Sequence, residues 1–191
     1  MTELARAGIS FEEALSWPPI VVQTRISRTD DGGSTAPERQ IGDEAHWCVA
    51  NHRRPAILVH EEVSGSVYRR RRRLVFEKFY DDLSHDRVLD PVTGKPIGAI
   101  ASFFYYRFTR DPEEGGDWLR LLRSKGIDLH ETYYGEPPKP LHQVEHEIRD
   151  AWNRGSKEVE RSRERIMDAF IAKARRGEPT YGAQRMFGHE P

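Results

Sequence analysis

The chain has 191 residues, of which 32% are charged, yet its formal net charge is only −1. This balance excludes a polycationic nucleic-acid coat, although the arginines are clustered and residues 69–73 are all arginine. The single cysteine, Cys48, excludes a disulfide framework and a multi-cysteine zinc site.

Strand and helix patterns alternate through the first 140 residues. Residues 1–18 form a short extension, in which Ser10 and Glu13 have the spacing of a helix capping box. Residues 19–140 form the main domain. Apolar runs predict four strands, at 20–23, 56–59, 97–105 and 127–133. Periodic apolar residues predict the intervening helices, at 37–51, 74–83 and 112–125. The alternation predicts an α/β fold, with a mainly parallel sheet and helices on both faces.

A long helix is predicted to follow the main domain. Residues 141–176 lack a strand pattern, and their apolar side chains recur at intervals of three, four or seven residues. Asn153-Arg154-Gly155 is a point at which this helix could be interrupted. The apolar stripe is too narrow for a fully buried helix, so we expect a partner subunit to cover part of it. We assign residues 141–177 to this helix and residues 178–191 to a tail.

Polar clusters follow three of the predicted strands. Arg25-Ile26-Ser27 follows the first strand, residues 61–65 follow the second, and residues 107–110 follow the third. Because the carboxyl ends of parallel strands lie at one edge of a sheet, these clusters should converge there. Together they supply a serine hydroxyl and several guanidinium groups, with no evident carboxylate set for a metal ion.

This combination of groups suits phosphoryl chemistry. Planar guanidinium groups bind phosphate oxygens in pairs and stabilise the charge of a transition state. A serine held among arginines can attack a phosphodiester without a metal ion. A lone serine at Ser27 would more simply cap a turn, but the arginines recur at the matching strand ends. The pattern therefore favours a phosphodiester site.

Five segments extend this pattern along the chain. They are Thr24-Arg25-Ile26-Ser27, Glu38-Arg39-Gln40, Glu61-Glu62-Val63-Ser64-Gly65, the arginine run before Leu74 and Phe76, and Tyr106-Arg107-Phe108-Thr109-Arg110-Asp111. In order and spacing they resemble the motifs of the serine recombinases, the family of the resolvases, invertases and large serine integrases. The resemblance covers about residues 21–177.

The resemblance implies an enzyme that cuts and rejoins DNA strands through a phosphoserine link at Ser27, with neither a metal ion nor another cofactor. It implies that the scissile phosphate is held by Arg25, Arg73, Arg107 and Arg110. Arg72 is the alternative to Arg73, because the run of arginines leaves the register open. Gln40 and Glu61 match supporting positions, and Glu61 stands where the family usually has aspartate.

The resemblance also implies partners. The long helix looks like the dimerisation helix of the family, which lies over the DNA minor groove, where Arg161 and Arg165 would contact phosphates. We therefore expect double-stranded DNA as a partner, and a homodimer that becomes a tetramer on DNA. No stretch has membrane-spanning length, and the N-terminus is acidic where a leader would be basic. We expect a cytoplasmic protein associated with the nucleoid.

Two positions depart from the family pattern, and they leave an alternative open. Gln23 stands where the family usually has an aromatic residue, and Tyr106 stands where it usually has aspartate. A chain without that carboxylate could be a DNA-associated relative that keeps the fold and its oligomerisation but lacks cleavage. Family members also continue into a DNA-binding module. Because this chain stops at Pro191, we expect a catalytic fragment, a protein targeted by its partner, or a shortened relative.

A second motif supports a different hypothesis. His142-Gln143-Val144-Glu145-His146 fits the H-x-x-E-H pattern of a class of zinc peptidases. The two histidines would lie one helical turn apart, with Glu145 as the base, and a downstream acid would complete the site. Glu158 and Glu160 are the helical candidates for that acid, but they lie roughly 18 Å or more along the same helix. Surface histidines on a charged helix are the simpler interpretation.

Overall fold

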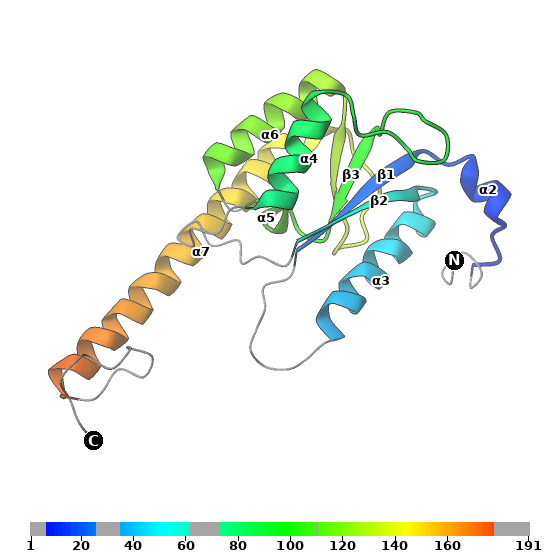
Figure 1. The fold of residues 1–191 in the computed structure, drawn as a ribbon. Coiled ribbons are helices and arrows are strands. Elements are labelled where there is room, and N and C mark those ends of the chain that lie inside the picture. Colours follow the sequence, from blue (N-terminus) through cyan, green and yellow to red (C-terminus); the bar gives the residue numbers. More distant parts are fainter. Residues whose placement is uncertain (1–6, 26–34, 62–72, 110, 178–191) are drawn as a thin grey trace. The chain divides into compact units, whose positions relative to one another are not determined.

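The computed structural model describes residues 7–25, 35–61, 73–109 and 111–177 (Figure 1). Four strands form an all-parallel sheet in the order β2-β1-β3-β4. The strands are β1 (Pro19–Arg25), β2 (Arg54–Glu61), β3 (Ala99–Ser102) and β4 (Asp128–Glu131). The parallel sheet of the predicted α/β fold is confirmed.

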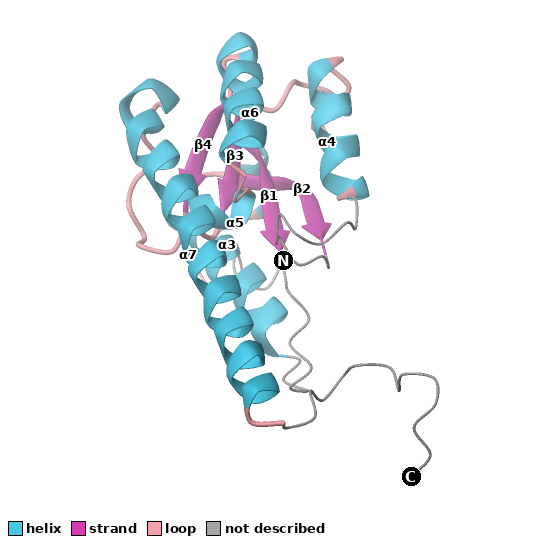
Figure 2. Ribbon diagram, turned by 90° about the vertical axis from the view of Figure 1, so that its left-hand side faces the viewer, coloured by secondary structure: helices cyan, strands magenta, loops and turns pink. Residues whose placement is uncertain are grey.

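One face of the sheet is covered by α3 (Thr35–Ala50). Ile20 and Val22 of β1 pack with Ala101 of β3 against Trp47 and Cys48 of this helix. Figures 1 and 2 show α3 on this side, with α4 and α6 on the opposite side. Val21, between Ile20 and Val22, packs into the core on the other face, because successive side chains of a strand point to opposite faces.

The larger apolar core lies on the other face of the sheet. It is covered by α4 (Leu74–Ser84), α6 (Pro112–Lys125) and the first part of α7 (Leu141–Arg175). Trp118 of α6 is buried at its centre, and its ring lies 4.7 Å from that of Phe76 and 4.8 Å from that of Phe108. Helices on both faces, the second part of the fold prediction, are therefore confirmed.

Local capping accounts for three of the helix boundaries. In α2 (Phe11–Leu15), the hydroxyl of Ser10 accepts a hydrogen bond from the backbone of Glu13 at 3.1 Å, as the capping-box spacing predicts. In α6, the Asp111 carboxylate accepts from the backbone of Glu113 at 2.9 Å. Gly126 ends α6 at a φ of 65°, a conformation that glycine adopts without strain. The predicted range 112–125 matches α6.

The third predicted strand, 97–105, is too long. β3 ends at Ser102, and the chain turns into a short helix, α5 (Tyr105–Phe108). The backbone N–H of Tyr105 donates to the Glu131 carboxylate at 3.1 Å, and the Tyr105 carbonyl accepts from the indole of Trp152 at 2.8 Å. These partners come from β4 and α7, so the apolar run alone could not show where the strand ends.

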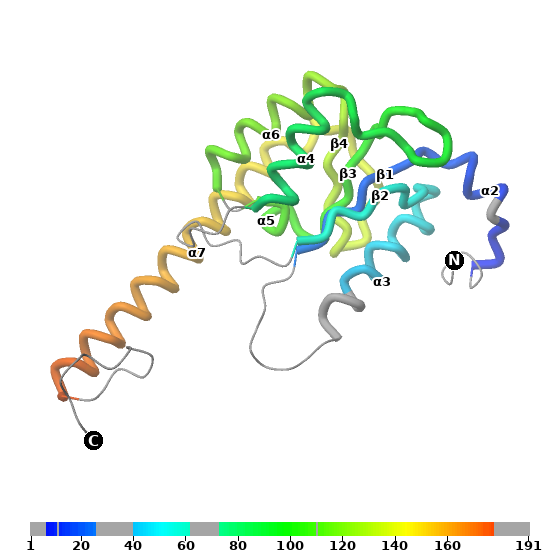
Figure 3. The backbone as a smooth tube through the Cα atoms, in the orientation of Figure 1, coloured from blue at the N-terminus to red at the C-terminus, as the bar shows by residue number. Residues whose placement is uncertain are grey.

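The long helix is continuous from Leu141 to Arg175 and is not interrupted at 153–155 (Figure 3). The chain nevertheless divides into two compact units, residues 1–155 and 156–191. In the first unit, Leu141, Ile148 and Trp152 are buried. In the described part of the second unit, residues 156–177, four large apolar side chains are exposed: Ile166, Met167, Phe170 and Ile171. No helix in the described ranges is both long and apolar enough to cross a membrane.

The contact between α6 and α7 gives a stability prediction. A Cβ atom added to Gly115 would lie 2.2 Å from the Trp152 indole, which is buried and packed. We expect Gly115→Ala to lower the free energy of unfolding by about 1–3 kcal/mol, because the indole must move. Gly116, the next residue of the same helix, has only the Arg120 side chain within 4 Å, at 3.9 Å.

Gly116→Ala is therefore the matched control. Alanine is the better helix former, so this variant should be more stable than the parent by about 0.5–1 kcal/mol. Urea unfolding of the three proteins measures both changes. Equal stability of the two variants would contradict this packing of α6 on α7.

Candidate functional site

The carboxyl edge of the sheet collects buried charged side chains. β1 ends at Arg25 and β2 at Glu61, and these two residues are register partners in the parallel pair. Both are only 2% exposed. Charged groups are seldom buried this deeply without partners, so their contacts decide what this edge can do.

Arg25 and Arg107 each donate to a backbone carbonyl in the other's segment. The Arg25 Nη2 donates to the Tyr106 carbonyl at 3.3 Å, and the Arg107 Nη1 donates to the Arg25 carbonyl at 3.4 Å. These reciprocal bonds join the end of β1 to α5, across 82 residues of sequence. They place two guanidinium groups at the point where the chain leaves β1, two residues before Ser27.

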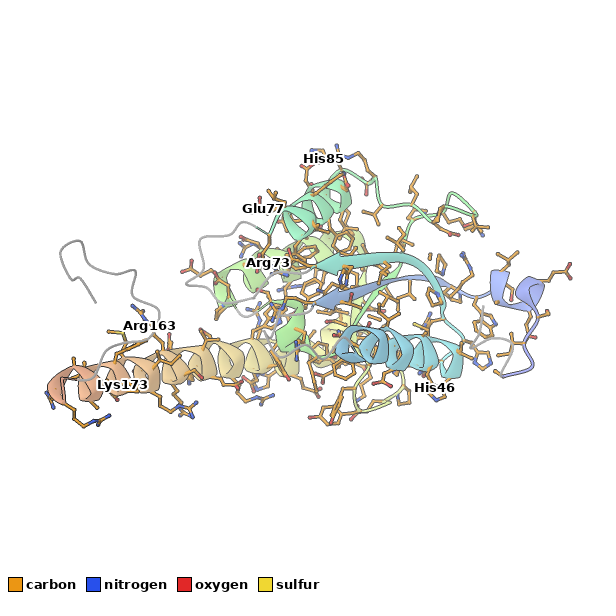
Figure 4. The ribbon with its side chains drawn as sticks, turned by 60° about the horizontal axis from the view of Figure 1, so that its bottom comes forward. His46, Arg73, Glu77, His85, Arg163 and Lys173 are labelled. Carbon is orange, nitrogen blue, oxygen red and sulfur yellow. The ribbon has the colours of Figure 1, made fainter. Side chains whose placement is uncertain are left out.

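Arg73, labelled in Figure 4, forms the centre of a network that links four elements. Its Nε donates to Glu61 at 2.6 Å, its Nη1 to Glu114 at 3.1 Å, and its Nη2 to the Phe108 carbonyl at 3.1 Å. Its guanidinium carbon also lies 3.7 Å from the ring centroid of Phe76, within cation–π range. Bonds to described residues use three of the five N–H groups of this guanidinium, and the other two have no partner among those residues.

Glu114 is a member of this network that the sequence analysis missed. Its carboxylate accepts from Arg73 and also from the hydroxyl of Thr109. The residue lies in the first turn of α6, where an acid is favourable beside the positive end of the helix dipole. The helix dipole alone is a sufficient reason for an acid at this position, so nothing in the sequence indicated that Glu114 also binds Arg73.

The predicted site residues are distributed as follows. The structure brings together Arg25, Glu61, Arg73 and Arg107 at the carboxyl edge. Gln40 is buried on α3, the helix on the opposite face of the sheet from α4. Arg161 and Arg165 are exposed on the part of α7 in the second unit. Three residues lie outside the described ranges: Ser27, Arg72 and Arg110.

Glu44, another residue that the sequence analysis missed, lies beside Gln40. Its carboxyl group is fully buried, and burial raises its pKa from 4.5 to about 8. The Gln40 side chain and the Phe103 backbone are its polar neighbours, although no described group meets hydrogen-bonding geometry with either carboxyl oxygen. The group is therefore mainly neutral at pH 7. Glu44 lies between Ile41 and Cys48 on the apolar face of the predicted helix, and this spacing could have indicated that its side chain is buried.

Tyr106, which stands where the family usually has aspartate, takes part in this edge through its backbone. Its carbonyl accepts from Arg25, whereas its ring stacks on Phe104 with centroids 4.8 Å apart and planes at 16°. The aromatic side chain therefore joins a cluster of rings beside the guanidinium groups.

The alternative zinc motif has other partners. Glu145 accepts from Arg123 at 2.9 Å and from Arg149, and His146 lies 3.8 Å from Asp150. Within the described ranges, no three His, Cys, Asp or Glu side chains are grouped closely enough to hold a metal ion. The described residues therefore do not form the site that the peptidase hypothesis requires.

Comparisons with known proteins agree with the fold. No protein-family model matches the chain, and no curated protein matches its sequence. A resolvase family site-specific recombinase from Streptococcus pneumoniae has a similar structure, with a TM-score of 0.52 and 18% identity over 83% of this chain and 99% of that chain. The N-terminal catalytic domain of TP901-1 integrase also matches, with a TM-score of 0.52 and 14% identity over 74% of this chain and 98% of that domain.

This chain has the fold of a serine-recombinase catalytic domain. The fold that the resemblance implied is thus confirmed. At 18% and 14% identity the similarity is one of fold, so in this serine-recombinase fold the roles of individual residues rest on the geometry of this chain.

The Arg73 network gives the second stability prediction. A lysine at this position keeps the charge, but one ammonium group cannot reproduce the planar arrangement that reaches Glu61, Glu114 and the Phe108 carbonyl together. Because one ammonium would leave part of this buried network without a donor, we expect Arg73→Lys to lower the free energy of unfolding by about 2–4 kcal/mol.

Arg120→Lys provides the matched control on the surface. Arg120 pairs with Asp117 on the exposed side of α6, and an exposed pair of this kind is worth at most about 1 kcal/mol. Urea unfolding should show a small change for Arg120→Lys and a large one for Arg73→Lys. Similar losses in the two variants would mean that the buried network does not stabilise this edge.

Proposed function

We propose that this chain is the catalytic domain of a site-specific DNA recombinase that acts through a covalent phosphoserine intermediate at Ser27. The observation that carries the proposal is that Arg25, Arg73 and Arg107, from three distant segments, lie at one edge of the sheet. Arg25 precedes Ser27 by two residues. The recombinase fold supports it, since it provides the parallel sheet whose carboxyl edge holds these groups.

The proposed reaction is a transesterification. The Ser27 hydroxyl loses its proton and attacks the phosphorus of a DNA phosphodiester, so that a P–Oγ bond forms while one P–O bond to deoxyribose breaks. The leaving sugar oxygen gains a proton. The new phosphodiester keeps the energy of the old one, so attack by a sugar hydroxyl of another strand rejoins the DNA without ATP. The protein therefore needs no external energy source, but it must stabilise the negative charge of the transition state.

The guanidinium groups would stabilise that negative charge. Arg107 uses one described hydrogen bond and is only half-buried, which leaves most of its N–H groups for the phosphate oxygens. Arg25 lies closest in sequence to Ser27 and is fixed by the Tyr106 carbonyl. Arg73 would contribute through its two remaining N–H groups, and Arg110 would add a fourth positive charge.

The second unit supports the proposed partners. A helix that leaves Ile166, Met167, Phe170 and Ile171 exposed has an apolar stripe suited to a second copy of the chain. The exposed Arg161 and Arg165 on the same helix suit the phosphates of double-stranded DNA. We propose a homodimer that becomes a tetramer on DNA, in the cytoplasm with the nucleoid.

The covalent intermediate is the direct test of this function. The chain is incubated with labelled duplexes that carry a nick within randomised sequence, so that a cleaved strand fragment diffuses away and the adduct accumulates. We expect a denaturation-resistant protein–DNA adduct that Ser27→Ala abolishes. Arg107→Ala should lower its rate of formation by about 100-fold or more, the scale of losing one charge-stabilising donor, whereas Arg120→Ala should leave it unchanged.

Three results would contradict this proposal. DNA binding or oligomerisation without any adduct would support the alternative hypothesis, in which Tyr106 replaces a needed aspartate and the protein does not cleave DNA. An adduct that persists in Ser27→Ala would require another nucleophile. Stoichiometric zinc that is lost in His142→Ala would instead support the peptidase hypothesis.

A further inference from the structure

Five aromatic rings form one cluster where β3 and β4 end. The ring of Phe104 lies 4.8 Å from Phe103, 4.8 Å from Tyr106 and 4.3 Å from Tyr133, measured between centroids. Tyr134 joins through its contact with Tyr133 at 5.0 Å. The backbone of Tyr133 also donates to the Phe103 carbonyl at 3.1 Å, which fixes the loop after β4 to the end of β3.

The cluster is unusual because its outer rings face solvent. Tyr133 is 53% exposed and Tyr134 is 68% exposed, whereas the aromatic rings of the core, such as Phe76 and Trp118, are 1% exposed. Isolated exposed apolar residues are common on proteins, but a connected set of exposed rings is characteristic of a binding surface. Stacking energy within the cluster holds the rings in place without covering the outer pair.

The cluster is directly connected to the guanidinium edge. The carbonyl of Tyr106 accepts from Arg25, and Arg107 is the next residue along α5. Flat aromatic rings and guanidinium groups therefore share one short segment. The neighbouring acids have local partners: Glu131 accepts from the Tyr105 backbone, and Glu136 pairs with Lys139 at 2.5 Å.

A ligand that matches both features combines a flat ring with a phosphate. Nucleotides have this combination, and proteins that bind single strands use aromatic rings for the bases and cations for the backbone. A base within a duplex is already stacked on its neighbours, so only an unpaired base could reach the rings. A purely apolar protein partner would use the rings but not the half-buried Arg107 guanidinium next to Tyr106.

We propose that this aromatic cluster, with Tyr134 as its most exposed ring, binds an unpaired nucleobase of DNA beside the phosphate held by Arg25 and Arg107. The proposal rests on the proposed function, since it assigns a contact for DNA opened near the point of cleavage. It also gives Tyr106 a role that an aspartate at that position could not have.

Two DNAs and three proteins test the proposal. The full-length Ser27→Ala chain, which leaves DNA uncut, is titrated into a labelled duplex and into the same duplex with a short unpaired stretch that contains 2-aminopurine. We expect tighter binding of the unpaired DNA, with quenching of the 2-aminopurine fluorescence. Adding Tyr134→Ala should weaken binding of the unpaired DNA by about tenfold, the scale of one base stacked on an aromatic ring, and remove much of the quenching.

Tyr134→Phe is the matched control, because it keeps the ring and removes only the hydroxyl. It should bind the unpaired DNA as tightly as the parent, and all three proteins should bind the intact duplex equally. Equal binding of the unpaired DNA by the alanine and phenylalanine variants would overturn the nucleobase site while leaving duplex binding intact. Loss of self-association in Tyr134→Ala, without any change in DNA binding, would overturn it in favour of a protein contact. Failure of the parent to bind either DNA would remove the proposed function itself.

Discussion

The Arg73 guanidinium is the interaction on which the candidate site depends. It connects β2 through Glu61, α6 through Glu114, α5 through the Phe108 carbonyl and its own helix, α4, through the ring of Phe76. The Arg73 side chain is 14% exposed and that of Glu61 only 2%, so the pair is largely removed from water. A buried pair of this kind gives little net stability over apolar packing, but loss of one partner is costly. Its main consequence is geometric, because it fixes α5 and hence Arg107 against the ends of the strands.

Much of this arrangement could be predicted from the sequence. The order of strands and helices follows from apolar periodicity, and the parallel sheet follows from their alternation. Convergence of Arg25, Glu61 and Arg107 follows in turn, because parallel strands place their carboxyl ends at one edge. These inferences depend only on local patterns and on one topological rule, which explains why they could be made without a structure.

The features that could not be predicted depend on distant partners. Tyr105 begins a helix because Glu131, 26 residues further along, accepts its backbone N–H. Residues 69–73 are five equivalent arginines in sequence, and the contacts of Arg73 with Glu61 and Glu114 could not be foreseen from such a run. Glu44 reads as a polar residue of an amphipathic helix, but α3 turns it against the sheet, where burial raises its pKa to about 8. In each case the missing information is a contact between segments.

The proposed function combines these parts: buried charges hold this edge of the sheet, and exposed groups beside it would meet the DNA. Its central claim is that Ser27 is the residue joined to the phosphate. Mass spectrometry of the adduct, after digestion of both protein and DNA, tests that claim most directly. The account predicts a residual nucleotide on Ser27. A nucleotide on a tyrosine, such as Tyr106 or Tyr133, would contradict it.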